Sequence, residues 1–560
     1  MNRRRSMLFF FAASILSLSL IVTGCAAPAA MSNAPMPAPT LAATTAPESQ
    51  AGKMPDNNSG GLQATTEPAP GEGQYNPDLS DEWYAGDDSE SNDVNVGGEG
   101  YNSTRENDFK NAVNNPLSTF SIDVDTASYT NIRRYIKDGQ RPPQEAVRLE
   151  EMVNYFHYNY PKPSGQDPFA MHVEVFKCPW NRNNLLALVG VQGKDIDEES
   201  LPPANIVFLL DVSGSMQDDD KLPLLKSAFT MLTGEMRSKD RISIVTYSSN
   251  VNVVMEATPG NQKNTIMRAL DSLESGGSTA GAAGLDMAYK VAQRNFIQNG
   301  NNRIILATDG DFNVGVDTEA GLQKLVEQKR SEGVFLSVMG FGTGNIQDNK
   351  METMADKGNG NYFYIDSITE AYKVMSSEMK GNLYTIAKDV KLQIEFNPAM
   401  VSGYRLLGYE NRVIKNKDFT NDKKDAGELG AGHTVTALYE IVPANASTEV
   451  GQTLKYQNVK INAYDEWMTV HLRFKKPTES VSSQLDAAIA SSYYRSVPST
   501  DAMFATAVVE WGLILKDSKY KGTASYDSVK HLGNMGKGDD EDGFRSEFLQ
   551  LVDRASNMWY

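Results

Sequence analysis

The stretch Asn205–Met216, with the sequence NIVFLLDVSGSM, decides which fold we expect for this chain. Its first part, Asn205–Leu210, contains an unbroken apolar run, which is typical of a parallel strand that is covered on both faces of a sheet. The run ends at Asp211, and Ser213 and Ser215 follow on alternate positions. Because open α/β sheets bind their ligands at the carboxyl ends of the strands, we expect this loop to form a binding site.

The loop offers one carboxylate and two hydroxyl groups, from Asp211, Ser213 and Ser215. All three are hard oxygen donors. Mg²⁺ prefers such donors, keeps several waters and is held by few protein charges, and Mn²⁺ accepts the same ligands. The alternative interpretation is that these side chains only form a turn or cap the next helix, as short runs of this kind often do.

The DxSxS pattern of Asp211, Ser213 and Ser215 resembles the metal-ion-dependent adhesion site of the von Willebrand factor A (VWA) domain family. That family also requires a Thr after the second crossover and an Asp after the fourth strand. Thr279 precedes a predicted helix and Asp309 follows a predicted strand, so both requirements have candidates. The resemblance implies that the Ser and Thr hydroxyls contact the metal directly, while the two Asp carboxylates hold its water ligands.

The segment from about 203 to 380 alternates strand-like and helix-like patterns. Strands are predicted at 205–210, 241–247, 251–255, 302–308, 334–339 and 361–365, and helices at 222–236, 265–273, 280–296, 319–330, 348–356 and 369–379. This alternation predicts right-handed βαβ units and a mostly parallel sheet with helices on both faces, the Rossmann-like α/β architecture of a VWA domain. Such a sheet would bring Asp211, Thr279 and Asp309 to one edge.

Two further regions flank this domain. An N-terminal α+β domain is predicted at 116–202, with strands at 118–125, 169–177 and 185–192 and helices at 127–137 and 147–156. A C-terminal β-rich domain is predicted at 381–480, with strands at 387–396, 399–409, 433–441, 454–464 and 466–475. The last region, 481–560, is predicted to be helical at 484–516, from 527 and at 544–558.

Motifs outside the VWA segment carry a second resemblance. They are DVDTASY at 123–129, DAGELGAGH at 425–433 and YKG at 520–522, in a predicted helix hairpin. Together with the metal motif they resemble the bacterial YfbK-like VWA lipoproteins, and this implies an architecture far better than it implies an activity. Within the first motif, Asp123 and Asp125 alternate at a strand end, so we interpret them as a solvated edge or a helix cap rather than as ligands.

The N-terminus has the pattern of a bacterial export signal. Within residues 1–24, three Arg precede an apolar run and small residues follow it. The tetrapeptide Val22–Cys25 resembles a lipobox, which predicts that Cys25 carries a lipid anchor. A plain membrane anchor or an ordinary signal peptide remains the alternative, although the apolar run is short for a spanning helix.

Residues 25–105 are rich in Ala, Pro, Ser and Gly and become acidic near their end. A segment of this composition cannot bury enough apolar surface to offset its ordering entropy, so it is predicted to be a disordered tether. We therefore expect a membrane-anchored lipoprotein of the bacterial cell envelope, on the outer membrane or on the outer face of the plasma membrane.

The formal charge of the 560-residue chain is −18. Such a chain repels phosphate backbones, which argues against a nucleic-acid partner. Of the two Cys, Cys25 is assigned to the lipid, so Cys178 is left without a disulfide partner and is expected to be a small buried side chain.

Two classes of function remain to be weighed. A metal-assisted hydrolase would need a general base beside the metal, and neither a His nor a Glu adjoins the DxSxS loop in sequence. We therefore expect a binding protein and not an enzyme, with Mg²⁺ (or Mn²⁺) accepting a carboxylate from a protein partner. The alternative is an envelope scaffold in which the metal is purely structural.

Overall fold

The computed structural model describes residues 93–310, 319–424, 426–446, 450 and 460–559. The predicted signal peptide, Cys25 and the predicted tether up to residue 92 lie outside these residues. Within them, no helix combines the length and the apolar character that crossing a membrane requires.

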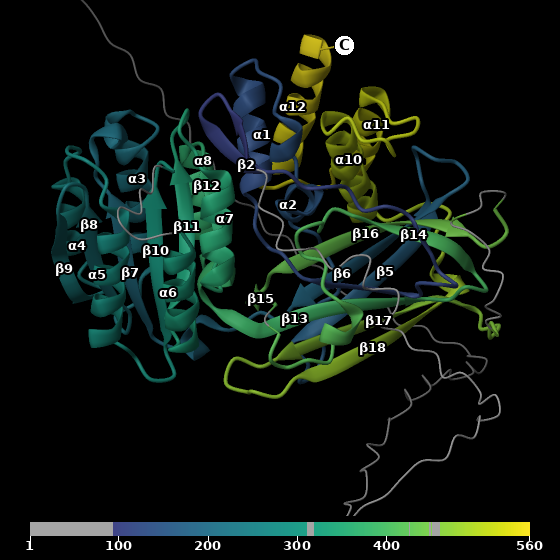
Figure 1. Cartoon of the computed structure of the whole chain (residues 1–560), viewed down its shortest axis with the longest axis horizontal. Helices are drawn as coiled ribbons and strands as arrows, with labels where there is room; N and C mark the ends of the chain where they lie inside the picture. Colours follow the sequence, from purple (N-terminus) through teal and green to yellow (C-terminus); the bar gives the residue numbers. More distant parts are fainter. Residues whose placement is uncertain (1–92, 311–318, 425, 447–449, 451–459, 560) are drawn as a thin grey trace, which may run out of the picture. The chain divides into compact units, whose positions relative to one another are not determined.

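The VWA segment folds around a six-stranded sheet with the order β12-β11-β10-β7-β8-β9. Its strands are β7 (Ala204–Asp211), β8 (Arg241–Tyr247), β9 (Val251–Pro259), β10 (Asn301–Thr308), β11 (Phe335–Phe341) and β12 (Tyr362–Ile365). All neighbours are parallel except β8 and β9, which are antiparallel. Figure 1 shows this sheet with helices on both sides, so the predicted fold class is confirmed.

Strand β7 is central because both of its faces are covered. Ile206, Phe208 and Leu210 pack into one apolar core, and Val207 and Leu209 pack into the core on the other face. The helices around the two cores are α3 (Leu222–Glu235), α4 (Lys263–Asp271), α8 (Ile368–Tyr372) and α9 (Met379–Leu383) on the first face, and α5 (Gly281–Arg294), α6 (Glu319–Ser331) and α7 (Asp348–Lys357) on the second. Each fully buried aliphatic side chain contributes about 1.5–3 kcal/mol to stability.

Ten further strands form two antiparallel sheets that share one apolar core. One sheet has the order β15-β13-β17-β18 with β4 also paired to β13, and the other has the order β3-β14-β16-β6-β5. The strands are β3 (Lys110–Asn111), β4 (Leu117–Ser121), β5 (Phe169–Lys177), β6 (Leu185–Gly193), β13 (Thr385–Phe396), β14 (Val401–Leu407), β15 (Gly427–Gly430), β16 (Thr434–Pro443), β17 (Glu466–Lys475) and β18 (Ser483–Ala490). We call this pair of sheets the sandwich.

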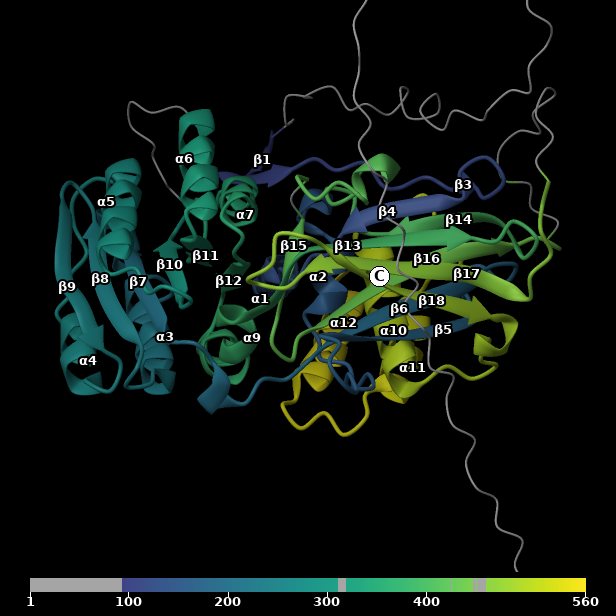
Figure 2. The same cartoon turned by 90° about the horizontal axis from the view of Figure 1, so that it is seen from below.

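Strands that precede the VWA segment pair with strands that follow it. Strand β4 pairs with β13, as Figure 2 shows, and β6 pairs with β16. The strands predicted for a flanking domain at 116–202 and those predicted at 381–480 therefore belong to the same two sheets. Local patterns cannot reveal this arrangement, because pairing across more than 200 residues is decided by the tertiary fold.

Five helices share a fourth apolar core with one face of the sandwich. They are α1 (Ala127–Lys137), α2 (Leu149–Asn154), α10 (Thr500–Leu515), α11 (Tyr526–Gly536) and α12 (Phe544–Trp559). Helix α10 is buried on all sides, and its cap residue Ser499 accepts a hydrogen bond from the backbone N–H of Ala502 at 3.1 Å.

Three predictions about elements need correction. The helix predicted at 484–516 is wrong in its first part, because Ser483–Ala490 is strand β18: exposure alternates along it, and it pairs antiparallel with β17. Residues 460–464 form no strand, and the rest of the strand predicted at 454–464 lies outside the described residues. The predicted tether ends too late, because β1 (Asp93–Val96) and β2 (Glu99–Asn102) form a hairpin.

Candidate metal site at the carboxyl edge of the VWA sheet

Two loops of the predicted site are held together by their backbones. The loop after β7 and the loop before α5 exchange two hydrogen bonds, from Gly214 N to the carbonyl of Gly277 at 2.9 Å and from Gly276 N to the carbonyl of Val212 at 2.8 Å. Gly277 has a φ of +87°, and a Cβ there would lie 2.5 Å from the hydroxyl of Ser249, so this turn requires glycine. The pairing brings the segment that carries Thr279 beside the DxSxS loop.

Asp211 is the last residue of β7 and is fully buried. One carboxylate oxygen accepts a hydrogen bond from Ser213 N at 2.9 Å, and the other accepts one from the hydroxyl of Thr308 at 3.2 Å. Burial raises the pKa of Asp211 to about 6, against the lowering effect of the hydrogen bonds from Ser213. The carboxylate is therefore fixed in orientation and is ionised at neutral pH.

The two serines that follow present their hydroxyls to each other, with 3.1 Å between the Oγ atoms of Ser213 and Ser215. Ser213 is buried, whereas Ser215 is exposed. Although Ser213 lies at the N-cap position of the short helix Gly214–Gln217, its side chain makes no capping hydrogen bond. The capping-only interpretation therefore does not account for its hydroxyl.

Asp309 follows β10 and completes the site from the third loop. Its carboxylate forms an ion pair with Lys221 Nζ at 3.1 Å, and both side chains are buried. Burial acts to raise the pKa of Asp309, but hydrogen bonds from Ser215 and Asn345 and the charge of Lys221 outweigh it and lower the pKa. The bond from Ser215 links the DxSxS loop directly to Asp309.

Thr279 is half-buried in the loop before α5. The structure thus places all five predicted residues on three neighbouring loops: contacts join Asp211, Ser213, Ser215 and Asp309, and the backbone pairing brings the loop of Thr279 beside them. Asp311 and Asn313, which follow Asp309 closely in sequence, lie outside the described residues.

The donors fit a hard divalent cation. The site offers hydroxyl oxygens and two carboxylates, and one of these carboxylates is already compensated by Lys221. Among the described residues, no group of three or more His, Cys, Asp or Glu side chains could hold a metal. A softer, nitrogen- or sulfur-liganded metal such as structural zinc is therefore a poor fit for these donors, whereas Mg²⁺ or Mn²⁺ suits them.

Sequence reasoning missed three polar residues of the site: Thr308, Asn345 and Lys221. Thr308 and Asn345 are ordinary loop or strand-end residues in sequence and gain their roles only from the fold. Lys221 gave a weak signal, since it is the single cation after three consecutive acids, Asp218–Asp220. Its stem packs against Gly342, where a side chain would collide with it.

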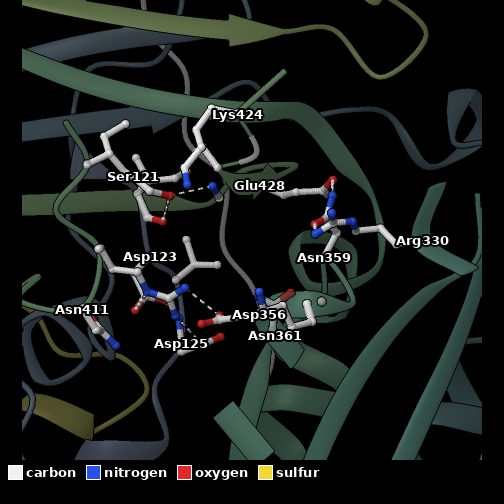
Figure 3. A pocket seen from close by; sticks show the side chains of 18 of the residues that line it. Ser121, Asp123, Asp125, Arg330, Asp356, Asn359, Asn361, Asn411, Lys424 and Glu428 are labelled. Atoms are coloured by element: carbon white, nitrogen blue, oxygen red, sulfur yellow. Dashed lines mark hydrogen bonds and ion pairs between the residues drawn. The ribbon is translucent and has the colours of Figure 1, made fainter. Parts of the chain in front are cut away.

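A second polar region lies between the VWA domain and the sandwich. A cavity of about 460 Å³ is lined there by Asp123, Asp125, Asp356 and Arg412, and Figure 3 shows the three carboxylates facing its lower part. Arg412 pairs with Asp123 at 3.0 Å and with Asp356 at 2.6 Å. The prediction that Asp123 and Asp125 form a solvated edge or a cap is wrong, because both are buried and Arg412 holds them.

The fold and the site together define a VWA-domain protein. The family model for the von Willebrand factor type A domain matches residues 205–377, which include Asp211, Ser213, Ser215, Thr279 and Asp309. Two further models match the flanks: "von Willebrand factor" at 95–188 and "Uncharacterized protein YfbK, C-terminal" at 381–558. VWA domains generally mediate protein–protein interaction or adhesion, and this general role applies to the chain.

A relative in Escherichia coli (strain K12), "Uncharacterized protein YfbK", is 41 % identical over 475 residues, which cover 83 % of this chain and 82 % of the relative. The chain therefore belongs to the YfbK-like family of VWA-domain proteins. Inter-alpha-trypsin inhibitor heavy chain H3 of Mus musculus is 25 % identical over 295 residues, covering 50 % of this chain and 32 % of that protein. A solved VWA structure from Catenulispora acidiphila is 15 % identical and covers 69 % of this chain and 89 % of that chain, with a TM-score of 0.39.

Proposed function

We propose that this protein binds a protein partner through a divalent cation, Mg²⁺ or Mn²⁺, held at the carboxyl edge of the VWA sheet. The observation that carries the proposal is the pair of facing hydroxyls of Ser213 and Ser215, 3.1 Å apart, beside the fixed and buried carboxylate of Asp211. These oxygens, with Thr279 and Asp309, would hold the ion. Bound Mg²⁺ would supply a positively charged, partly hydrated centre that can accept a carboxylate oxygen.

The charge balance of the site favours a carboxylate ligand. Lys221 compensates Asp309, whereas Asp211 is hydrogen-bonded only by neutral donors within the described structure. The protein therefore contributes about one uncompensated negative charge, and a divalent cation would leave the centre with net positive charge. An acidic side chain of a partner would neutralise that charge.

The test combines melting with capture. Saturating Mg²⁺ should raise the melting temperature of the purified protein, because a ligand that binds only the native state stabilises it by about 2.7 kcal/mol at a hundredfold excess over Kd. Asp211→Ala should abolish this rise and also abolish Mg²⁺-dependent crosslinking to a partner in intact cells. The variant should remain folded, because the core around β7 does not depend on the ion.

Each alternative has its own outcome. A melting temperature that is indifferent to millimolar Mg²⁺ would refute the metal site. If Mg²⁺ stabilises the unaltered protein as expected but Asp211→Ala still captures the partner, the ion has a structural role and the scaffold is favoured. Metal-dependent turnover of generic phosphoester or peptide substrates, lost in Asp211→Ala, would instead reveal a hydrolase, which we do not expect.

We further propose that the protein acts at the bacterial cell envelope as a lipid-anchored protein. The support is the lipobox-like tetrapeptide Val22–Cys25 after a positively charged and apolar N-terminal segment. Cys25→Ser should shift the protein from the membrane fraction to the soluble fraction or leave it as an unprocessed precursor. Unchanged fractionation and electrophoretic migration would contradict the anchor.

A further inference from the structure

The β1–β2 hairpin, residues 93–102, lies against the segment 342–347, which we call the β11–α7 loop. Gly100 N donates to the carbonyl of Ile346 at 2.9 Å, and the side-chain amide of Gln347 donates to the carbonyl of Gly98 at 3.2 Å. A Cβ on Gly98 would lie 2.6 Å from the carbonyl oxygen of Gly344, so the two backbones approach as closely as glycine allows. The hairpin is thus joined to this loop by backbone contacts.

Glu99 is the centre of this contact. Its side chain accepts hydrogen bonds from Gly344 N at 3.0 Å, from two nitrogens of Arg134 at 3.0 and 2.7 Å, and from the hydroxyls of Tyr101 and Tyr135 at 2.7 and 2.8 Å. Burial acts to raise the pKa of Glu99, but the hydrogen bond and charge of Arg134 outweigh it and lower the pKa. One ionised carboxylate therefore ties helix α1, the hairpin and the β11–α7 loop together.

Apolar packing fixes the same hairpin. Tyr101 is fully buried and forms a small cluster with Tyr135 and Ala146. The hairpin therefore has both an apolar anchor and a charged one. A carboxylate with five donors around it tolerates neither loss of charge nor replacement of an oxygen by an N–H group.

The opposite side of the β11–α7 loop forms part of the metal site. Lys221 Nζ donates to the side chain of Asn345 at 3.4 Å and to Asp309 at 3.1 Å. Gly342 packs on the stem of Lys221, and Gly310, which follows Asp309, approaches the backbone of Gln347 so closely that a Cβ would lie 2.7 Å from its nitrogen. The β11–α7 loop therefore helps to hold the Lys221 ammonium group beside Asp309 and packs its own backbone against Gly310, the residue that follows Asp309.

We infer that the β1–β2 hairpin is a strap that positions the metal site, with Glu99 as a positioning residue acting through Gly344, Asn345 and Lys221 on Asp309. This inference rests on the proposed metal function. The segment that the sequence predicts to be a tether joins the strap directly at Asp93. Displacement of the strap would leave the β11–α7 loop less ordered. Metal binding would then have to order the loop, and the conformational entropy lost in doing so would weaken the affinity for the metal.

The experiment is Mg²⁺ titration calorimetry on the full chain. Glu99→Gln places an amide N–H against either Gly344 N or the tyrosine hydroxyls, and we expect it to weaken Mg²⁺ binding about tenfold, as changes to residues behind metal ligands commonly do. Amide hydrogen exchange of residues 342–347 should become faster in the same variant. Tyr135→Phe, which removes one hydroxyl from Glu99, should weaken binding by a smaller factor.

The matched control is Glu440→Gln in the sandwich. Glu440 is also a buried carboxylate surrounded only by donors, from Arg405 at 3.0 Å, Trp180 at 3.2 Å and Asn184 at 2.6 Å, but none of these contacts reaches the β11–α7 loop. We expect both Glu440→Gln and Glu99→Gln to lower the melting temperature, but Glu440→Gln should leave the Mg²⁺ affinity unchanged.

The outcomes separate the inference from the function on which it rests. If the unaltered protein binds no Mg²⁺, the proposed function itself fails. If it binds Mg²⁺ and the affinity is the same in Glu99→Gln and Tyr135→Phe, the metal site stands and the strap is refuted. Should Glu99→Gln fail to fold, Tyr135→Phe decides alone. Equal weakening in Glu440→Gln would show a general effect of stability and would also refute the strap.

Discussion

At the carboxyl end of β7, Lys221 pairs with Asp309, and hydroxyl and amide groups also donate hydrogen bonds to Asp211 and Asp309. At helix α7, by contrast, carboxylates crowd around two arginines, Arg148, which is buried, and Arg412, which is partly buried. Arg148 contacts Glu151, Asp348 and Glu352, and Arg412 contacts Asp123, Asp125 and Asp356. We call this second group the interface cluster, because it joins α7 of the VWA domain to α2 and to loops of the sandwich.

The difference lies in what each arrangement leaves open. The proposed metal site keeps an exposed hydroxyl, that of Ser215, and the carboxylate of Asp211, which has no cationic partner among the described residues. In the interface cluster, the guanidinium groups engage the carboxylates directly, and helix α7 supplies Asp348, Glu352 and Asp356 from one face at intervals of four residues. Carboxylates in the interface cluster therefore hold the fold together, whereas those at the carboxyl edge of the VWA sheet would be available for the ion that we propose.

The largest expected effect comes from breaking the interface cluster. Arg148→Ala would leave the buried carboxyl groups of Glu151, Asp348 and Glu352 without the guanidinium that contacts them, whether they are ionised or protonated, and the free energy of unfolding should fall by about 3–5 kcal/mol. Chemical denaturation measures the change. Arg294→Ala serves as the control, because its pair with Glu256 is exposed and should contribute less than about 1 kcal/mol. If both variants lose the same free energy of unfolding, the interface cluster stabilises the protein no more than a surface ion pair does.

A second effect follows from the protons that the interface cluster holds. Burial raises the pKa of Glu151 to about 8 and that of Glu352 to about 7, and it also raises the pKa values of Asp125 and Asp356. The folded protein therefore binds protons that the unfolded chain releases at neutral pH. The stability that these groups contribute is complete below their unfolded pKa, near pH 4.5, and is lost as the pH rises through 7 and 8.

We therefore expect the free energy of unfolding to fall between about pH 5 and 8, by up to about 1.4 kcal/mol per pH unit for each proton that the folded state holds in excess. Glu352→Gln keeps the position of the acceptor for Asn411 but cannot titrate, so it should flatten the profile. Melting temperatures measured across this range test the prediction. Glu327→Gln is the control, because the pKa of Glu327 is lowered by its hydrogen bond with Lys357, and it should leave the slope unchanged.

The smallest effect on stability belongs to the metal site. Ser215 is exposed, so Ser215→Ala should change the free energy of unfolding without metal by no more than about 0.5 kcal/mol. The same variant should nonetheless weaken Mg²⁺ binding by about tenfold or more, because it removes both a hydroxyl donor and the bond to Asp309. Calorimetry with and without Mg²⁺ separates the two quantities. A large loss of stability without metal would show that Ser215 serves the fold and not the site.

Much of the VWA domain was predictable because its signals are local. The apolar run of β7 is buried on both faces as expected, and the strand predicted at 241–247 matches β8 residue for residue. Outside this domain, the helix predicted at 127–137 likewise matches α1. The five residues predicted to hold a metal lie within the range that the family model matches, and their role as metal ligands stays a prediction. A βαβ succession leaves few alternatives for which loops meet at one edge of the sheet.

The tertiary structure alone decided the rest. Lys221, Asn345 and Glu99 have no distinctive sequence pattern, and their roles arise because loops separated by about a hundred residues or more come within hydrogen-bonding distance. The shared sheets of the sandwich also depend on pairing partners distant in the chain, as in the pairing of β16 with β6. Because Asp123 and Asp125 occupy alternate positions at a strand end, the sequence predicts that they are solvated. In the structure both are buried and pair with Arg412. The sequence by itself determines the periodicity and the chemistry of the side chains. Burial and interaction partners depend on tertiary packing, and they decide whether a charged side chain stabilises the fold or is available to bind a ligand.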